Sequence, residues 1–241
     1  MTTATLSTIT PETRIGDLVA ARPGLARLFE ELRIDYCCGG KQSLAAASES
    51  RGFSVSTVIT MLEAASAALS AVPVDVDAAG MTLTDLADHI ERTHHAYLKD
   101  ELPRLVEMAD RVAYKHGSRD PRLREIATTV GELAQEMFGH MEKEERILFP
   151  LVRQIDAGRI GGFAASIADP IRQMEAEHDD AGRATERLHR LTDGFIPDAE
   201  ACNTHRALLH GLARFEADLH RHVHKENNVM FPRALAAASG V

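Results

Sequence analysis

Two eleven-residue stretches contain the residues best suited to bind a metal ion. They are residues 140–150, HMEKEERILFP, and residues 222–232, HVHKENNVMFP. In each stretch a His precedes a Glu by four residues, and Phe-Pro follows the Glu after four more residues. The two pairs are His140 with Glu144 and His222 with Glu226. On an α-helix such a pair shares one face, so each stretch can direct an imidazole and a carboxylate to one point.

Both pairs fall within the apolar stripe of their predicted helix. Around His140 the stripe is formed by Leu133, Met137, Ile147, Leu148 and Leu151, and around His222 by Phe215, Leu219, Val229 and Met230. Glu136 shares the face of His140 and Glu144, which places a second acid toward the core. Burying such groups without partners costs several kcal/mol, and a bound metal ion removes that cost.

One His-x3-Glu pair alone is more typical of an exposed pair on a helix surface than of a metal site. The second copy, 82 positions later, changes this interpretation. Two further helices offer more imidazoles, with His89, His94 and His95 in the first and His178 in the third. His95 and His178 lie 83 positions apart, nearly the spacing of the two pairs. The pattern indicates a duplicated helix pair that contributes one His and then one His-x3-Glu.

The resulting ligand set has four imidazoles and two carboxylates. Its members are His95, His140, Glu144, His178, His222 and Glu226. Carboxylate and imidazole ligands favour iron or manganese, whereas zinc prefers four ligands in a tetrahedron. We therefore expect two iron ions, each with two terminal imidazoles, bridged by both carboxylates and by an oxo-type oxygen.

The elements that position these residues are all predicted to be helical. Residues 1–71 predict a small helical domain whose first helix starts at Thr10-Pro11, and residues 72–80, with Pro and Gly, predict a linker. Residues 81–241 predict an antiparallel four-helix bundle. Its helices are expected at about 82–114, with a break at Pro103, then from Asp120-Pro121 to 155, from Asp169-Pro170 to 191, and from 197 to 236. The fold class is all-α.

Composition excludes several other classes of protein. A net charge of −9 argues against a nucleic-acid partner. No apolar run approaches the roughly 18 residues that a membrane span needs, and the start of the chain lacks a signal-peptide pattern, so we expect a cytoplasmic protein. Twelve His, against three Tyr and no Trp, fit a metal-binding protein.

Two of the three cysteines are adjacent, Cys37 and Cys38, and they precede Gly39-Gly40. Buried cysteines often act only as small hydrophobic residues. A pair within a helix-breaking turn is more typical of an accessible dithiol, which could bind a metal, form an intermolecular disulfide or be nitrosated. Three cysteines do not make a disulfide framework, which fits a reducing compartment. Cys202 is expected to be structural.

The bundle resembles the hemerythrin-like di-iron family. It departs from oxygen-carrying hemerythrin, whose last helix pairs a His with an Asp five residues on, because that position here is Asn227. Residues 35–41, DYCCGGK, come ahead of such a bundle, and with 177–179, EHD, and 226–228, ENN, they resemble the iron–sulfur cluster repair proteins. This resemblance covers nearly the whole chain.

The resemblance implies the six iron ligands already named, with His95 preferred to His94 because of its distance to Glu101-Leu102-Pro103. It implies that Glu136 and Glu177 line the site and that Cys37 and Cys38 take part in the chemistry. The implied function is repair of iron–sulfur clusters damaged by nitrosative or oxidative stress, with the protein as iron donor and damaged iron–sulfur proteins as partners. Alternatives are reduction of nitric oxide, or sensing of oxygen or nitric oxide without turnover. A homodimer is left open.

Overall fold

Helices make up nearly all of the regular structure in this computed structural model, which describes residues 9–69, 77–159 and 164–239. Within those ranges the only β-type pairing is one isolated bridge between Arg14 and Ser43. No helix in the described ranges is long and apolar enough to cross a membrane. The all-α prediction is confirmed.

The chain divides into two compact units. The first comprises Met1–Met81 together with Val223–Val229, and the second comprises Thr82–His222 and Met230–Val241. The linker expected at residues 72–80 falls largely outside the described residues, and Ala78–Gly80 form a short 3₁₀ helix, η3. The first unit therefore includes a segment far along the chain that no pattern in the sequence indicated.

Residues 9–69 of the first unit contain four α-helices and two 3₁₀ turns. They are α1 (Ile15–Ala21), η1 (Pro23–Leu25), α2 (Ala26–Glu31), η2 (Cys38–Lys41), α3 (Leu44–Ser50) and α4 (Val55–Leu69). The core contains Leu25, Phe29, Tyr36, Leu44 and Leu62, all at most 1 % exposed. The helix start predicted at Thr10 is wrong, because the backbone carbonyls of Pro11 and Thr13 accept hydrogen bonds from the start of α3 instead.

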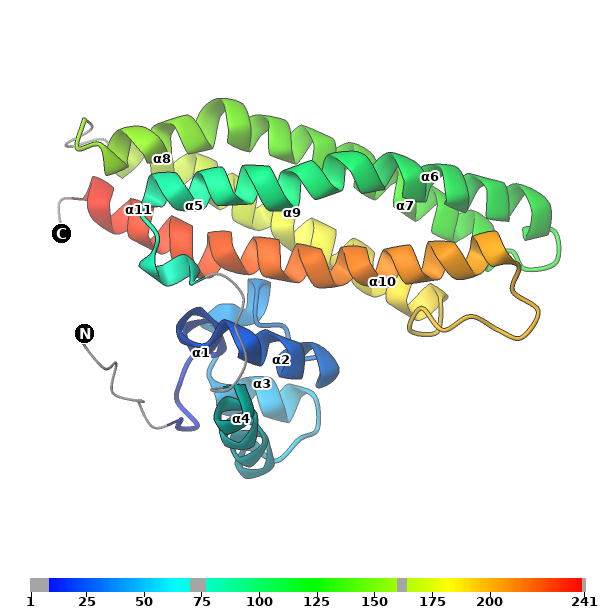
Figure 1. The fold of residues 1–241 in the computed structure, drawn as a ribbon, viewed down its shortest axis with the longest axis horizontal. Helices are drawn as coiled ribbons and strands as arrows, with labels where there is room; N and C mark the ends of the chain where they lie inside the picture. The colour runs from blue at the N-terminus through cyan, green and yellow to red at the C-terminus, as the bar shows by residue number, and fades with distance from the viewer. Residues whose placement is uncertain (1–8, 70–76, 160–163, 240–241) are drawn as a thin grey trace. The chain divides into compact units, whose positions relative to one another are not determined.

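The described part of residues 83–238 forms four long helices that run side by side in alternating directions (Figure 1). The first helix is α5 (Leu83–Ile90), η4 (Glu91–His95) and α6 (Ala96–His116), and the second is α7 (Arg122–Lys143), η5 (Glu144–Leu148) and α8 (Phe149–Asp156). The third is α9 (Ala164–Leu191), and the fourth is α10 (Asn203–His224), η6 (Lys225–Met230) and α11 (Phe231–Ala238). This is the antiparallel bundle that the sequence predicts.

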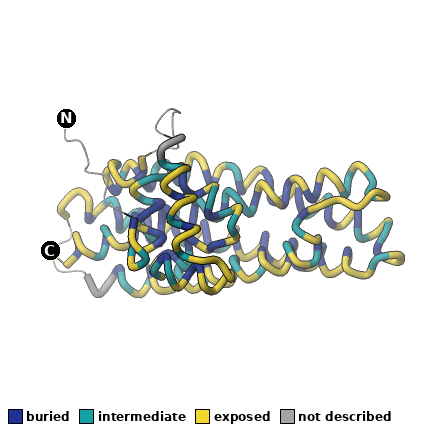
Figure 2. The backbone as a smooth tube through the Cα atoms, turned by 90° about the horizontal axis from the view of Figure 1, so that it is seen from below, coloured by how far each residue is buried: buried dark blue, intermediate teal, exposed yellow. Residues whose placement is uncertain are grey.

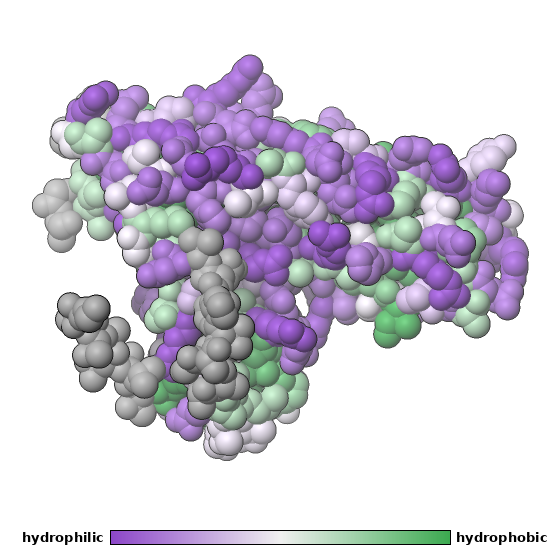
Figure 3. All heavy atoms as spheres, in the orientation of Figure 1, coloured by the Kyte–Doolittle hydropathy of each residue, from purple (hydrophilic) through white to green (hydrophobic). Residues whose placement is uncertain are grey.

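Burial follows the amphipathic pattern of the sequence. Buried and exposed residues alternate along each helix of the bundle (Figure 2), as expected when one stripe of each helix faces a shared core. The face of the bundle seen in Figure 3 is mostly hydrophilic, with apolar residues in scattered patches. The buried His and Glu side chains of the predicted ligand set are therefore exceptions to the apolar interior of the bundle.

Three of the four long helices are interrupted by one π-helical turn. These turns are η4, η5 and η6, and each one starts or ends close to a predicted metal ligand. A π turn inserts an extra residue into an α-helix and is often found at functional sites. It also changes which face later residues occupy, so projections based on a constant 100° per residue fail beyond it.

The π turn in the second helix corrects one expectation. Ile147, placed in the apolar stripe by projection, is 53 % exposed. Phe149, in the first turn of α8, is fully buried, and its ring stacks on His95 of the first helix with centroids 5.6 Å apart. Pro150 does not end the helix, because it occupies the first turn of α8, where its missing N–H costs nothing.

The prolines inside the bundle also differ from expectation. α6 continues through Pro103, and the irregularity of that helix is the π turn eight or more residues earlier. α9 begins at Ala164 and contains Pro170, so the start predicted at Asp169-Pro170 is wrong. The second helix begins at Arg122, one residue later than the start predicted at Pro121. Asp120 still caps it, because its side chain accepts the backbone N–H of Arg122 at 3.0 Å.

Candidate metal centre

The structure brings all six predicted ligand residues together in the bundle. Two overlapping groups have ligand atoms within 4.8 Å of one another, and every residue in them is buried. One group is His95, Glu144, His222 and Glu226, and the other is His140, Glu144, His178 and Glu226. The two carboxylates are common to both groups, and each group has two imidazoles of its own. Such groups could hold a metal ion.

Glu144 provides the test of whether a cation fits here. Its side chain is completely buried, and neither carboxylate oxygen has a hydrogen-bond partner among the residues that the structure describes. Its Oε2 lies 3.2 Å from His95 Nε2 and 3.4 Å from His140 Nε2. A buried carboxylate without hydrogen bonds is strongly unfavourable, and a cation held jointly with those imidazoles would remove the cost. The residues therefore fit a metal.

The imidazole of His140 is oriented by an acid on another helix. Its Nδ1 lies 2.9 Å from Glu177 Oε2, while its Nε2 lies 3.0 Å from His178 Nε2. With the Nδ1 proton donated to the carboxylate, the Nε2 lone pair faces the ligand group. The hydrogen bond with His140 lowers the pKa of Glu177 to about 2, with further hydrogen bonds from Lys143 and Gln173. Glu177 therefore remains a carboxylate.

His95 is held in the same way. Its Nδ1 lies 2.8 Å from Glu145 Oε1, and Lys99 Nζ lies 2.6 Å from the same oxygen. Partial burial raises the pKa of Glu145, but the hydrogen bonds from Lys99 and His95 outweigh it and leave that pKa lowered. An ionised acid on Nδ1 again leaves Nε2 facing the ligand group.

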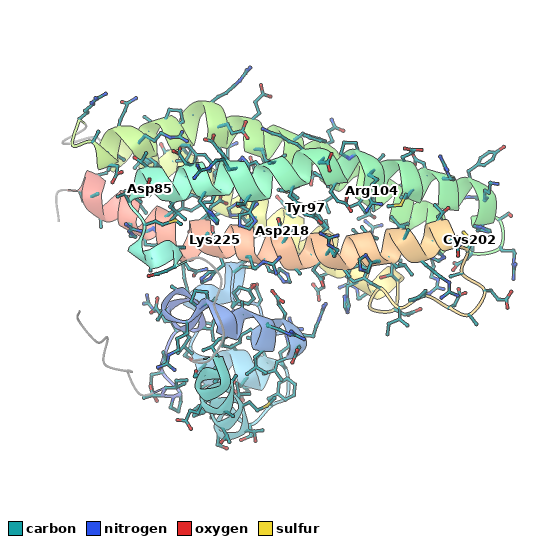
Figure 4. The ribbon with its side chains drawn as sticks, in the orientation of Figure 1. Asp85, Tyr97, Arg104, Cys202, Asp218 and Lys225 are labelled. Carbon is teal, nitrogen blue, oxygen red and sulfur yellow. The ribbon has the colours of Figure 1, made fainter. Side chains whose placement is uncertain are left out.

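The neighbouring His94 does not lie in either group of ligands. Its Nδ1 lies 3.0 Å and 3.1 Å from the two carboxylate oxygens of Asp218. Figure 4 labels Asp218 on α10. The ring of His94 stacks on His222 with centroids 5.2 Å apart and planes at 3°. His94 therefore supports a ligand helix, and His95 is the residue whose Nε2 faces Glu144.

Aromatic rings cover the imidazoles from inside the bundle. Phe149 stacks on His95, and Phe231 stacks on His178 with centroids 6.0 Å apart and planes at 4°. The two contacts repeat the 82- and 83-residue spacing of the sequence, so the duplicated pattern includes the Phe of each Phe-Pro pair. Both Phe side chains are buried. By stacking on His95 and His178, they limit the rotation of those two imidazoles.

Glu136 lies apart from the other predicted site residues. It is exposed on α7 and lines a groove of about 260 Å³ with Glu132, Asp180, Arg183 and Arg187. The expectation that it faces the core is wrong, because it lies at the edge of the apolar stripe, one turn before His140. Asp218, which precedes His222 by four residues as Glu136 precedes His140, does contact an imidazole, that of His94.

The cysteine pair belongs to the first unit. Cys37 is buried and Cys38 is half-buried, and with Asp35 they form a third group of ligand-type atoms within 4.8 Å of one another. His224 belongs to the same unit. It is buried, its Nδ1 lies 3.4 Å from the Tyr36 carbonyl oxygen, and burial lowers its pKa to about 4.

Sequence reasoning missed Glu145, Asp218 and Asp35. Asp218 could have been found, because Asp218-x3-His222 repeats Glu136-x3-His140 at a spacing of 82. Glu145 and Asp35 have no such signal, since their roles depend on contacts that only the fold creates.

Comparison with known proteins agrees with this arrangement. The family described as Hemerythrin HHE cation binding domain matches residues 86–234, which contain all six residues of the two groups. A second family, described as Domain of Unknown function (DUF542), matches residues 11–66, which contain the cysteine pair.

Several relatives match nearly the whole chain. The iron-sulfur cluster repair protein YtfE of Pectobacterium carotovorum subsp. carotovorum is 40% identical over 222 residues, covering 92% of this chain and 96% of the relative. Proteins of the same name from Enterobacter sp. and Salmonella newport are 38% and 36% identical over the same length. The chain therefore belongs to the hemerythrin HHE family and, within it, to the same family as the proteins named iron-sulfur cluster repair protein YtfE.

Proposed function

We propose that this protein repairs damaged iron–sulfur clusters and does so with iron held by the six buried ligands of the bundle. The observation that supports this most directly is the buried, hydrogen-bond-free carboxylate of Glu144 among four imidazoles. The relatives that match nearly the whole chain are named for the repair of iron–sulfur clusters. The substrates would be iron–sulfur proteins damaged by nitrosative or oxidative stress.

The proposed centre contains two iron ions. His95 and His222 would bind one ion, and His140 and His178 would bind the other. Glu144 and Glu226 would bridge them, since each belongs to both groups of ligands. Bound iron would supply a Lewis-acidic, redox-active centre and, in repair, the iron itself.

The chain's own residues would control how firmly iron is held. Glu177 and Glu145 orient two imidazoles and raise their basicity through the Nδ1 hydrogen bonds. Both acids are about three-quarters buried, and each also contacts a more exposed lysine, Lys143 or Lys99. Because these contacts reach the surface of the bundle, they offer a route by which a docking client could loosen the imidazoles.

A small ligand such as nitric oxide or oxygen could also bind at the centre. Two imidazoles and two shared carboxylates give each ion four donor groups, fewer than the six that octahedral metals accept. Reduction of nitric oxide is therefore the second candidate function.

We place the protein in the cytoplasm, with either a monomer or a homodimer as the working form.

The direct test is a repair assay on an iron–sulfur enzyme inactivated by nitric oxide. We expect iron-loaded protein to restore activity anaerobically, with two irons bound per chain at the start and a coupled iron pair in its Mössbauer spectrum. Glu144→Gln should bind less than half of that iron and lose repair, because the amide removes the shared negative charge. Headspace nitrous oxide, measured in parallel, separates repair from nitric oxide reduction.

The matched control is Glu142→Gln. Glu142 lies two residues before Glu144 on the same helix, but it is exposed and pairs with Arg146 at 2.7 Å. This variant should retain both iron and repair. If iron-loaded wild-type protein restores no more activity than the same amount of free ferrous iron, the repair proposal is wrong.

A further inference from the structure

A second cluster of ligand-type side chains lies in the first unit, between α2 and α3. Asp35, Cys37 and Cys38 each offer one atom, and the three atoms lie within 4.8 Å of one another. Cys37 is buried, Cys38 is half-buried and Asp35 is exposed. The cluster is thus enclosed on one side and accessible from solvent on the other.

The distances in the cluster suit a single metal ion. The two sulfur atoms are 4.0 Å apart, and Cys37 Sγ lies 3.0 Å from Asp35 Oδ1. Two thiolates bound to one tetrahedral ion at about 2.3 Å each stand about 3.8 Å apart. The sulfur atoms are therefore already spaced as a chelating pair, and only small movements would admit the ion.

The charges of the cluster also favour a cation. The pKa of the Cys37 thiol is raised well above its usual value by the hydrogen bond with Cys38, by burial and by the negative charge of Asp35. Without a metal, Cys37 therefore keeps its proton and its S–H can donate to Asp35. Two thiolates and a carboxylate would repel one another at these distances, and a divalent ion would offset that repulsion.

The backbone holds the cluster in this arrangement. Asp35 Oδ1 accepts the backbone N–H groups of Cys37 and Cys38, each at 3.0 Å, and Oδ2 accepts that of Gly39 at 3.0 Å. Asn228 belongs to the same unit, and its Nδ2 donates a hydrogen bond to the Cys37 carbonyl oxygen at 2.9 Å. Oδ2 has one such bond and retains a lone pair for a cation.

We propose that Asp35, Cys37 and Cys38 bind one thiophilic divalent cation, ferrous iron included, through two thiolates and one carboxylate oxygen. Binding forms two metal–sulfur bonds and releases two thiol protons to solvent, with no change of oxidation state. Three protein ligands leave a coordination position open, unlike the four-ligand structural zinc sites, so the ion can be exchanged. A role for this site in transferring iron during cluster repair would rest on the proposed function, but cation binding by the three residues does not.

The test is a titration of full-length, iron-loaded protein with Co²⁺ under anaerobic conditions and without added thiol. We expect thiolate-to-cobalt charge-transfer absorption in the near ultraviolet that saturates at one Co²⁺ per chain. Cobalt that enters the bundle would have only nitrogen and oxygen ligands and would not give this absorption. Cys38→Ser should abolish the band, and Asp35→Asn should weaken cobalt binding by about 10-fold or more.

Cys202→Ser is the matched control, since Cys202 lies outside the cluster, just before α10 at one end of the bundle (Figure 4). It should retain the full band. Cys38 is only half-buried, so Cys38→Ser should keep the hydrogen-exchange protection of the amides of α2 and α3, which verifies that the first unit is folded. Absence of the band in the wild type, or its survival in Cys38→Ser, overturns the proposal. Cobalt binding without repair activity would instead contradict only the proposed function.

Discussion

Glu177 shows how a single side chain can set the affinity of the centre without binding metal. It contacts Nδ1 of His140 at 2.9 Å, and Lys143 and Gln173 hold it in place. Glu177→Gln keeps the size of the side chain and removes its charge, so His140 becomes a weaker ligand. We expect iron affinity to fall by about 10- to 100-fold, measured by competition with a chelator.

Asp179→Asn is the control for that variant, because it removes one charge from an exposed position of the same helix, next to His178. It should change iron affinity by less than threefold. Equal losses in the two variants would show that general electrostatics, rather than the contact with His140, sets the affinity.

Sequence spacing, with the family resemblance to decide between His94 and His95, predicted which six side chains come together, because a repeat of 82–83 residues on helices constrains which faces meet. The ligand role of each residue stays a prediction. The supporting acids were less accessible to sequence reasoning: His94 and Asp218 lie 124 positions apart, and their contact follows from the packing of two helices. Glu136 shows the converse: it precedes His140 by one helical turn, which predicts a position facing the core, and yet its side chain is exposed.

At the scale of elements, the start of α5 is stabilised by a side chain of its own N-cap and by one from another helix. Asp156, the last residue of α8, accepts the backbone N–H of Thr84 in the first turn of α5 at 3.0 Å. Thr82, the N-cap of the same helix, accepts the N–H of Asp85 at 3.0 Å. The start of α5 is therefore capped twice, once from within and once from α8.

Removing the charge of Asp156 should weaken that cap in a pH-dependent way. The hydrogen bonds from Thr84 lower the pKa of Asp156 in the folded state, so its stabilisation is complete above the unfolded pKa of about 4 and is lost as pH falls through the lowered pKa. We expect Asp156→Asn to reduce the free energy of unfolding by about 0.5 kcal/mol at pH 7, since the site is exposed and screened. Urea unfolding at pH 7, 5 and 3.5 measures this.

Asp110→Asn, at an exposed position within α6, serves as the comparison. It should show no loss at pH 7. If the difference between wild type and Asp156→Asn stays constant, or grows, as pH falls from 5 to 3.5, the capping interpretation is wrong.

The four long helices were predictable because each has a clear apolar stripe and polar turns. The π turns were not predictable, since a single inserted residue leaves the local composition of the helix unchanged. Their effect is visible at Ile147, which the regular projection buries and the structure exposes. Pro170 misleads for a related reason: a Pro is favourable in the first turn of a helix, so the pattern predicts a start at Asp169-Pro170, whereas α9 begins earlier.

At the scale of the whole molecule, iron should stabilise the bundle much more than the cysteine-bearing unit. Without metal, the bundle must bury the Glu144 carboxylate without hydrogen bonds, whereas the described residues of the core around Phe29, Tyr36 and Leu62 include no such group. A ligand that binds only the folded state at 100 times its Kd adds about 2.7 kcal/mol. Because a chain of this size gains about 2–4 °C in Tm per kcal/mol, removal of iron should lower the Tm of the bundle by about 5–10 °C.

Hydrogen exchange read by mass spectrometry can follow the two units separately as iron is removed by a chelator. Amides of α7 and α9 should lose protection, while those of α2 and α3 should change little, and restoring ferrous iron should reverse the loss. Glu144→Gln should behave like the iron-free protein whether or not iron is supplied, because it lacks the shared carboxylate. Uniform loss of protection in α2, α3, α7 and α9 would instead mean that the two units unfold as one, and that iron stabilises the chain as a whole.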